Sequence, residues 1–181
     1  MLKGDTELIP DVAIVMGSDS DLETLEPGIK ILEELGVSHA VRVLSAHRTP
    51  LEMISFAKEA SRKGIKVIIA GAGGAAHLPG MIASLTHLPV IGVPVKSKSL
   101  SGIDSMYSIL QMPPGIPVAT VAIGGGLNAG LLAAQILSLS NQKIKEKISK
   151  YRDSLHNQVV EKDKKLQKIG STKYLSQMKF D

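Results

Sequence analysis

Residues 12–21 read Val-Ala-Ile-Val-Met-Gly-Ser-Asp-Ser-Asp, and this stretch decides the fold. The apolar run 12–16 ends at a glycine, which predicts a strand buried on both faces of a sheet. Apolar residues in 29–35 then follow at helical spacing, and Gly36 supplies a C-terminal stop. The interruption at Pro27-Gly28 predicts a kink or a late start of this helix. The segment is therefore expected to form a strand, a polar turn and a helix.

Short apolar runs and longer amphipathic segments keep alternating along the chain. Further strands are predicted at residues 40–44, 67–70, 90–93 and 118–123. Further helices are predicted at about residues 50–63, 77–86, 104–111 and 128–139. Strand–helix units in series imply a parallel sheet with helices on both faces, because crossover connections are right-handed. We therefore expect an α/β fold with three αβα layers and a parallel sheet of about five strands.

The C-terminal part of the chain differs from the rest in charge. Residues 1–140 carry 10 Lys and Arg against 12 Asp and Glu, whereas residues 141–181 carry 11 against 5. One Lys-rich helix is predicted from Asn141 to about Lys168, roughly 40 Å long at about 1.5 Å per residue. It carries an apolar stripe made of Ile144, Ile148, Tyr151, Leu155 and Val159. Because the core is expected to close without it, we predict a catalytic domain at 1–140 and a helical tail at 141–181 that packs on neighbouring subunits.

Composition excludes several classes of protein. The 181 residues include no Cys, which rules out disulfides, thiolate zinc sites and cysteine nucleophiles. Aromatic residues make up 3%, with no Trp, which argues against base-stacking nucleic-acid modules and against flavin binding. The net charge of +4 comes from the tail and does not indicate a nucleic-acid partner. Neither a signal peptide nor a membrane-spanning run is recognised, so we expect a cytoplasmic protein.

Polar and glycine-rich residues come directly after the first three predicted strands. Ligands of open α/β sheets bind at the carboxyl ends of the strands, so these three loops are expected to meet. The candidate site residues are Ser18, Asp19, Ser20 and Asp21 in the first loop, Ser45, Ala46, His47 and Arg48 in the second, and Gly71, Ala72, Gly73, Gly74 and His77 in the third.

These residue types indicate a phosphorylated small molecule and a proton transfer. Arg48 offers a planar fork for phosphate, and serine hydroxyls and helix N-termini add further donors. Imidazole suits general acid–base catalysis near neutral pH. No metal centre is expected, because His47 and His77 have no Asp or Glu at a recurring ligand spacing. The polar residues 96–105 after the fourth strand are a candidate lid.

Taken together, the loops resemble one family. They read Met-Gly-Ser-Asp-Ser-Asp at 16–21, Ser-Ala-His-Arg-Thr-Pro at 45–50 and Ala-Gly-Ala-Gly-Gly-Ala-Ala-His-Leu-Pro-Gly-Met at 70–81. This set resembles the N5-carboxyaminoimidazole ribonucleotide mutases of purine biosynthesis, in register over about residues 11–140. The resemblance implies a flavodoxin-like sheet and an octamer. It also implies a reaction without metal or organic cofactor, in which a carboxylate moves from N5 to C4 of an aminoimidazole ring.

The resemblance further implies where the substrate binds. Ser20, Ser45 and Arg48 would hold its phosphate, and Asp21 its ribose hydroxyls. Ser18 would contact the imidazole and the carboxylate.

The remaining loop residues would contact the reacting part of the substrate. The backbone of Gly71–Ala72 would contact the ring, His47 would be the general acid–base, and His77 would line the glycine loop. The family also implies that the substrate is passed on from an ATP-dependent carboxyaminoimidazole synthetase.

Two departures and two alternatives accompany the resemblance. Leu22 stands where the family often has Trp, and residues 124–126 are three glycines in place of a more varied loop. Both suggest altered helix packing or subunit contacts. One alternative is direct carboxylation of aminoimidazole ribonucleotide, although the animal-type carboxylase typically has Lys where Arg48 stands. The other is a non-catalytic flavodoxin-like binding or signalling domain.

Overall fold

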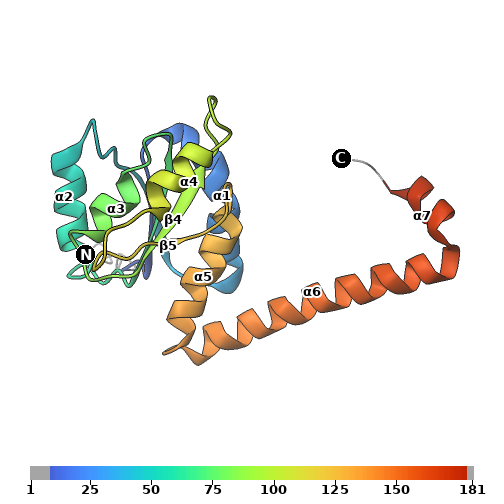
Figure 1. Cartoon of the computed structure of the whole chain (residues 1–181). Helices are drawn as coiled ribbons and strands as arrows, with labels where there is room; N and C mark the ends of the chain where they lie inside the picture. The colour runs from blue at the N-terminus through green and yellow to red at the C-terminus, as the bar shows by residue number, and fades with distance from the viewer. Residues whose placement is uncertain (1–8, 179–181) are drawn as a thin grey trace, which may run out of the picture.

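A five-stranded parallel sheet forms the centre of the computed structural model, which describes residues 9–178 (Figure 1). The strands run in the spatial order β2-β1-β3-β4-β5. Their bounds are β1 Val12–Met16, β2 His39–Val43, β3 Val67–Gly73, β4 Val90–Val95 and β5 Ala119–Thr120. This order is doubly wound, with a reversal between β1 and β3, and it confirms the predicted fold class.

Helices cover both faces of the sheet, and all six predicted helices are present. The helices are η1 (a 3-10 turn) Asp19–Asp21, α1 Leu22–Leu35, α2 Pro50–Glu59, α3 Leu78–Ala83, α4 Ile103–Leu110, α5 Gly126–Ser138, α6 Gln142–Ile169 and α7 Ser171–Gln177. Helices α1 and α5 pack on one face, and α2, α3 and α4 pack on the other. The short α7 follows Gly170 and was not predicted.

The alternation of side chains along β1 creates two cores. Val12, Ile14 and Met16 join the apolar cluster under α1 and α5, and Ala13 and Val15 join the cluster on the opposite face. All five residues are buried, as the uninterrupted apolar run predicts. Each of the Val, Ile and Met side chains contributes about 1.5–3 kcal/mol when it is withdrawn from water.

Three strands differ from their predicted lengths, and one of them is β4, which runs two residues past Val93 to Val95. Strand β3 continues beyond Ala70 to Gly73, because backbone pairing with β4 needs no side chain. The fifth strand, predicted over 118–123, is regular only at Ala119–Thr120. Its ladder ends beside Gly92 because Pro94 on β4 has no N–H to donate.

Helix α1 passes through Pro27 without a break, so the expected late start is wrong. The neighbouring Gly28 serves a close crossing between α1 and α5. A Cβ on Gly28 would lie 2.5 Å from the carbonyl oxygen of Gly126, and a Cβ on Gly130 would lie 2.7 Å from the carbonyl oxygen of Gly28. The glycines therefore let two helix backbones touch.

The beginning of the tail belongs to the core of this chain. Helix α6 is capped at its start by Asn141, whose side chain accepts hydrogen bonds from the N–H groups of Lys143 and Ile144 in the first turn. Ile144 and Ile148 are buried in the cluster that also contains Leu35 and Leu137. The prediction that the whole stripe faces a neighbour is wrong for these positions, because α1 and α5 leave the end of their cluster open until α6 closes it.

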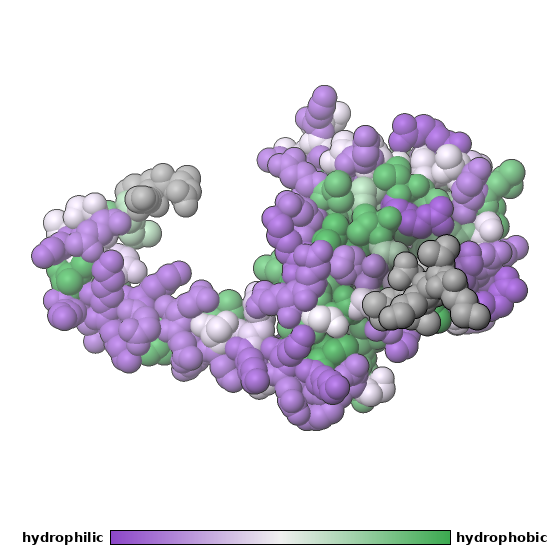
Figure 2. Space-filling view, turned by 180° about the vertical axis from the view of Figure 1, so that it is seen from behind, coloured by the Kyte–Doolittle hydropathy of each residue, from purple (hydrophilic) through white to green (hydrophobic). Residues whose placement is uncertain are grey.

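The rest of α6 extends away from the domain (Figure 1). Within the stripe, Leu155 is 43% and Val159 66% exposed. The extended arm is mostly hydrophilic, with separate hydrophobic patches along it (Figure 2). None of the helices between residues 9 and 178 combines the length and the apolar character that crossing a membrane requires.

Candidate functional site

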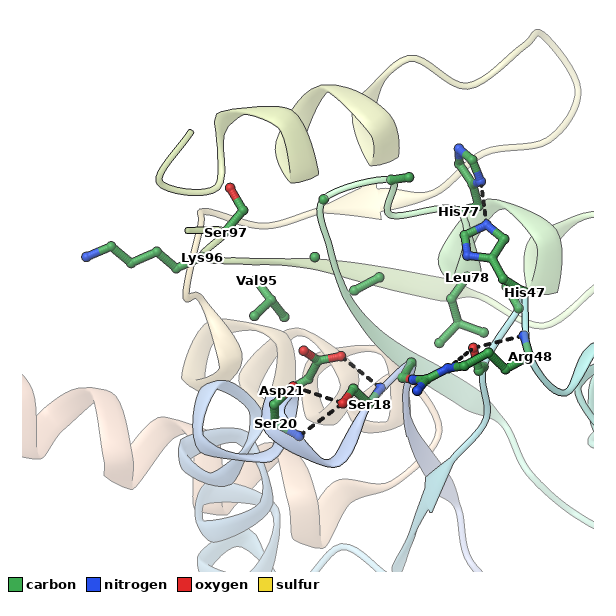
Figure 3. A pocket seen from close by; sticks show the side chains of 17 residues that line it. Ser18, Ser20, Asp21, His47, Arg48, His77, Leu78, Val95, Lys96 and Ser97 are labelled. Atoms are coloured by element: carbon green, nitrogen blue, oxygen red, sulfur yellow. Dashed lines mark hydrogen bonds between the residues drawn. The ribbon is translucent and has the colours of Figure 1, made fainter. Parts of the chain in front are cut away.

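A cavity of about 460 Å³ lies at the carboxyl ends of β1, β2, β3 and β4. This is the edge of the sheet where the strand order reverses, which is where doubly wound proteins bind ligands. Its lining comes from the three predicted loops and from the start of the loop after β4 (Figure 3). The cavity therefore collects residues that are far apart in the sequence.

The first loop folds into a small polar turn around Ser18. The Ser18 hydroxyl accepts a hydrogen bond from the Ser20 N–H at 3.4 Å and lies 2.9 Å from the Ser20 hydroxyl. The Ser18 N–H donates to the Asp21 carboxylate at 3.1 Å, which completes a reciprocal capping box. Hydroxyls and a helix start are thus presented to the cavity, as an anion requires.

Arg48 joins the second loop to the first. Its Nη2 donates to the Gly17 carbonyl at 2.9 Å, and its Nε donates to the Ser45 hydroxyl at 3.3 Å (Figure 3). Ser45 is held in turn by Thr49, whose hydroxyl accepts from the Ser45 N–H at 2.9 Å. The guanidinium is therefore held between the Ser45 hydroxyl and the Gly17 carbonyl, next to the turn that begins at Ser18.

His47 and His77 face each other although they are 30 residues apart. The distance from His47 Nε2 to His77 Nδ1 is 2.9 Å, and the rings meet edge to face. In such a pair one nitrogen donates and the other accepts, so the protonation of each ring constrains the other. Both side chains are exposed in the single chain and line the cavity (Figure 3). The pair can therefore exchange protons with a bound ligand.

The glycine loop forms the wall between the histidines and β4. Ala72, Gly73 and Gly74 line the cavity, but Gly71 does not. Gly71 lies beneath Leu25, where a Cβ would come within 2.9 Å of the leucine side chain. Gly71 is thus set back from the residues that line the cavity, and its backbone contact with a ligand stays a prediction.

Asp21 is the buried carboxylate of the site. Its burial raises the pKa of the carboxyl above the usual value, and the negative charge of Asp19 adds to this rise. The backbone N–H groups of Ser18 and Gly17 oppose the rise in pKa, as does the charge of Arg48. Asp21 is thus placed to accept hydrogen bonds from a ligand's hydroxyl groups.

The structure brings most of the predicted site residues to one cavity. Eleven of the thirteen line it: Ser18, Ser20, Asp21, Ser45, Ala46, His47, Arg48, Ala72, Gly73, Gly74 and His77. Asp19 lies in an adjoining cavity of about 280 Å³ that shares Ser18, Ser45 and Arg48.

Sequence reasoning missed other lining residues: Gly17, Ala75, Leu78, Val95, Lys96 and Ser97. Lys96 and Ser97 directly follow β4, at the same edge of the sheet, so the strand-end rule would have found them. Both residues belong to the candidate lid predicted over residues 96–105. Between residues 9 and 178, no cluster of three or more His, Cys, Asp or Glu that could hold a metal ion is found.

We expect Arg48→Lys to weaken the binding of a sugar phosphate by about tenfold, measured by calorimetry. Lysine replaces a planar fork with a point charge, and it cannot reach the Gly17 carbonyl and the Ser45 hydroxyl together. Arg62→Lys is the matched control, because Arg62 pairs with Glu59 on the surface, far from the cavity. Unchanged affinity in Arg48→Lys would show that Arg48 does not hold the phosphate.

The sequence and the structure are similar to those of several known proteins. The AIR carboxylase family matches residues 11–158. N5-carboxyaminoimidazole ribonucleotide mutase of Thermotoga maritima is 54% identical over 169 residues, which are 93% of this chain and 99% of that protein. Phosphoribosylaminoimidazole carboxylase of Candida glabrata is 52% identical over 166 residues, 92% of this chain but 29% of that protein. The crystal structure of Treponema denticola PurE is similar with a TM-score of 0.80 at 36% identity, covering 87% of this chain and 98% of that one.

Proposed function

The chain belongs to the AIR carboxylase family, and from that premise we propose that it is a 5-(carboxyamino)imidazole ribonucleotide mutase of purine biosynthesis. The observation that carries the proposal is the His47–His77 pair, which opens onto a cavity lined by Arg48 and serine hydroxyls. The Thermotoga maritima mutase matches over nearly its whole length. A non-catalytic domain would not need two histidines beside the ligand.

The cavity accommodates the parts of such a substrate in order. The hydroxyls of Ser20 and Ser45 and the guanidinium of Arg48 would bind the phosphate. Asp21 would accept hydrogen bonds from the ribose hydroxyls. The imidazole would then lie against the backbone of Ala72–Gly74, which carries no side chain larger than a methyl group. This order leaves the carboxylated nitrogen and the ring carbon facing the histidines.

His47 is proposed to donate a proton in the first step and to accept a different proton in the second. When the N5–carboxylate bond breaks, its electron pair stays on nitrogen, carbon dioxide is released, and the imidazolium delivers a proton to that nitrogen. Ring carbon C4 then attacks the carbon dioxide and forms a C–C bond. The now neutral imidazole removes the proton from C4, which restores both the aromatic ring and the protonated base. Atoms and charge balance without an outside reactant.

Direct carboxylation of aminoimidazole ribonucleotide is the competing reaction, because a carboxylase is also 52% identical to this chain. The experiment that separates the two supplies either the N5-carboxylated substrate or the unmodified ribonucleotide with bicarbonate. We expect rapid formation of the C4-carboxylated product only from the first. Turnover only with the second would replace the mutase by a carboxylase.

We further propose that the chain works as a homo-oligomer, with an octamer expected from the family. Within residues 9–178, α6 packs on α5 and α1 near its start and meets α7 at its far end. Its middle therefore leaves the apolar side chains of Leu155, Val159 and Leu166 exposed on an isolated helix. An isolated, largely polar helix is marginal in water, and burial of such a stripe against another copy would stabilise it.

We expect Val159→Asp to lower the native mass measured by light scattering, because a carboxylate would be buried in the proposed interface. Asn157→Asp is the matched control. It introduces the same charge on the opposite side of α6 and is expected to leave the mass unchanged. A wild-type mass of 19.2 kDa, or an equal effect of both variants, would contradict the assembly.

A phosphorylated substrate does not cross a membrane unaided, and this supports the expectation of a cytoplasmic enzyme. Delivery of the substrate by a carboxyaminoimidazole synthetase stays a prediction from the family resemblance.

A further inference from the structure

The hydroxyl of Ser105 is buried at a junction of three segments behind the active site. Ser105 is fully buried, and it and Asp21 are the buried polar residues in the described part of the chain. Its Oγ donates to the Val95 carbonyl at the end of β4 at 2.7 Å. The same oxygen accepts from the Gly74 N–H at 2.8 Å. One side chain of α4 thus joins the sheet to the glycine loop.

A second hydroxyl on the same face of α4 holds the other side of Gly74. Ser108, one turn after Ser105, donates to the Gly74 carbonyl at 3.3 Å. Gly74 has φ +67°, a conformation that L side chains rarely adopt, although nothing lies within 4 Å of where its Cβ would be. A glycine is therefore required at position 74 because of the backbone conformation that the two serines hold. There would be enough space for a side chain.

The held residue begins the short segment that carries His77. Ala76 N–H donates back to the Gly74 carbonyl at 2.8 Å, and the next residue is His77. His77 Nδ1 must then stay 2.9 Å from His47 Nε2. A displacement at Gly74 would be transmitted over three residues to the imidazole pair, and misplacement by about 1 Å can cost about 100-fold in rate.

We propose that Ser105 is a positioning residue of the active site, which fixes the glycine loop through the Gly74 amide and so keeps His77 against His47. This inference rests on the proposed function, because it assigns Ser105 to the geometry of that reaction. Ser105 itself does not line the cavity and is not proposed to touch the substrate. Ser108 assists from the carbonyl side.

Ser105→Ala is expected to lower kcat by at least tenfold and to change KM by less than threefold. The phosphate would still bind to Ser20, Ser45 and Arg48, which lie on the other two loops. In the same variant, hydrogen exchange monitored by mass spectrometry should become faster in peptides covering residues 71–78. Ser108→Ala, which removes only the longer contact, should change kcat and exchange in the same direction by less.

Ile109→Val is the control for general loosening of α4, because Ile109 is buried on that helix and packs over Gly92. It should leave kcat and the exchange of residues 71–78 close to wild type. The inference is overturned if Ser105→Ala keeps the wild-type kcat and exchange, or if Ile109→Val loses as much of both. If Ser105→Ala does not fold, the same comparison is made with Ser108→Ala. Absence of mutase turnover in the wild type would refute the proposed function, while the exchange measurement would still decide whether Ser105 holds the loop.

Discussion

Replacement of His47 by Asn is expected to reduce kcat by about 100-fold to 10,000-fold, the usual contribution of a general acid–base group. Asparagine keeps a polar side chain at this position, but its amide ends short of the Nε2 atom that contacts His77, and it cannot take up and return a proton. The affinity for a sugar phosphate should stay within about threefold, because the phosphate is held by Arg48 and the serines. The measurement is steady-state kinetics combined with calorimetric binding.

His87→Asn is the matched control for this substitution. His87 is exposed on the turn before β4, at the edge of the sheet opposite the carboxyl ends of the strands. The kcat of His87→Asn and its affinity for a sugar phosphate should equal those of the wild type. Should His47→Asn lose affinity and rate by the same factor, His47 would be a binding group, and proton transfer would have to be assigned elsewhere.

Gly126→Ala is expected to destabilise the fold by about 3 kcal/mol, toward the upper end of what overpacking costs. A Cβ at this position would lie 2.0 Å from the Thr24 carbonyl oxygen, an atom of the α1 backbone that cannot rotate aside. Helix propensity alone predicts the opposite sign, because Ala in a helix is favoured over Gly by about 1 kcal/mol. The sign of the change therefore decides between local propensity and the α1–α5 contact.

Thermal unfolding at one fixed protein concentration measures this effect, since assembly would make the midpoint depend on concentration. Asn128→Ala, an exposed position two residues further along α5, should leave the midpoint unchanged or raise it slightly. If the unfolding midpoint of Gly126→Ala is at or above that of the wild type, α1 and α5 cross less closely than the 2.0 Å between the added Cβ and the Thr24 carbonyl oxygen implies.

The sheet could be predicted because each of its strands carries its own local signal. The apolar runs at β1, β3 and β4 are short, continuous and buried on both faces. The features that the sequence did not predict depend on residues in other segments of the chain. The fifth strand is short because of Pro94 on its neighbour, and Gly28 is explained by Gly126 and Gly130 on α5. Periodicity in one segment carries no information about such contacts.

The sequence predicts which loops form the site, but it does not predict the distances between their side chains. Parallel strands end at one edge of the sheet, so the loops carrying Ser18, His47 and His77 had to meet. The direct hydrogen bond between His47 and His77 depends on how the glycine loop turns at Gly74. That Gly71 does not line the cavity depends likewise on contacts with another segment, because Leu25 of α1 packs against it.

The most direct test of the mutase is whether the carboxylate is transferred within the active site. The N5-carboxylated substrate is prepared with an isotopically labelled carboxylate and converted in the presence of excess unlabelled bicarbonate and carbon dioxide. If His47 moves the proton while the released carbon dioxide stays beside C4, mass spectrometry will find the label retained in the C4-carboxylated product. Product that carries the unlabelled carboxylate from solution would contradict intramolecular transfer and identify the enzyme as a carboxylase.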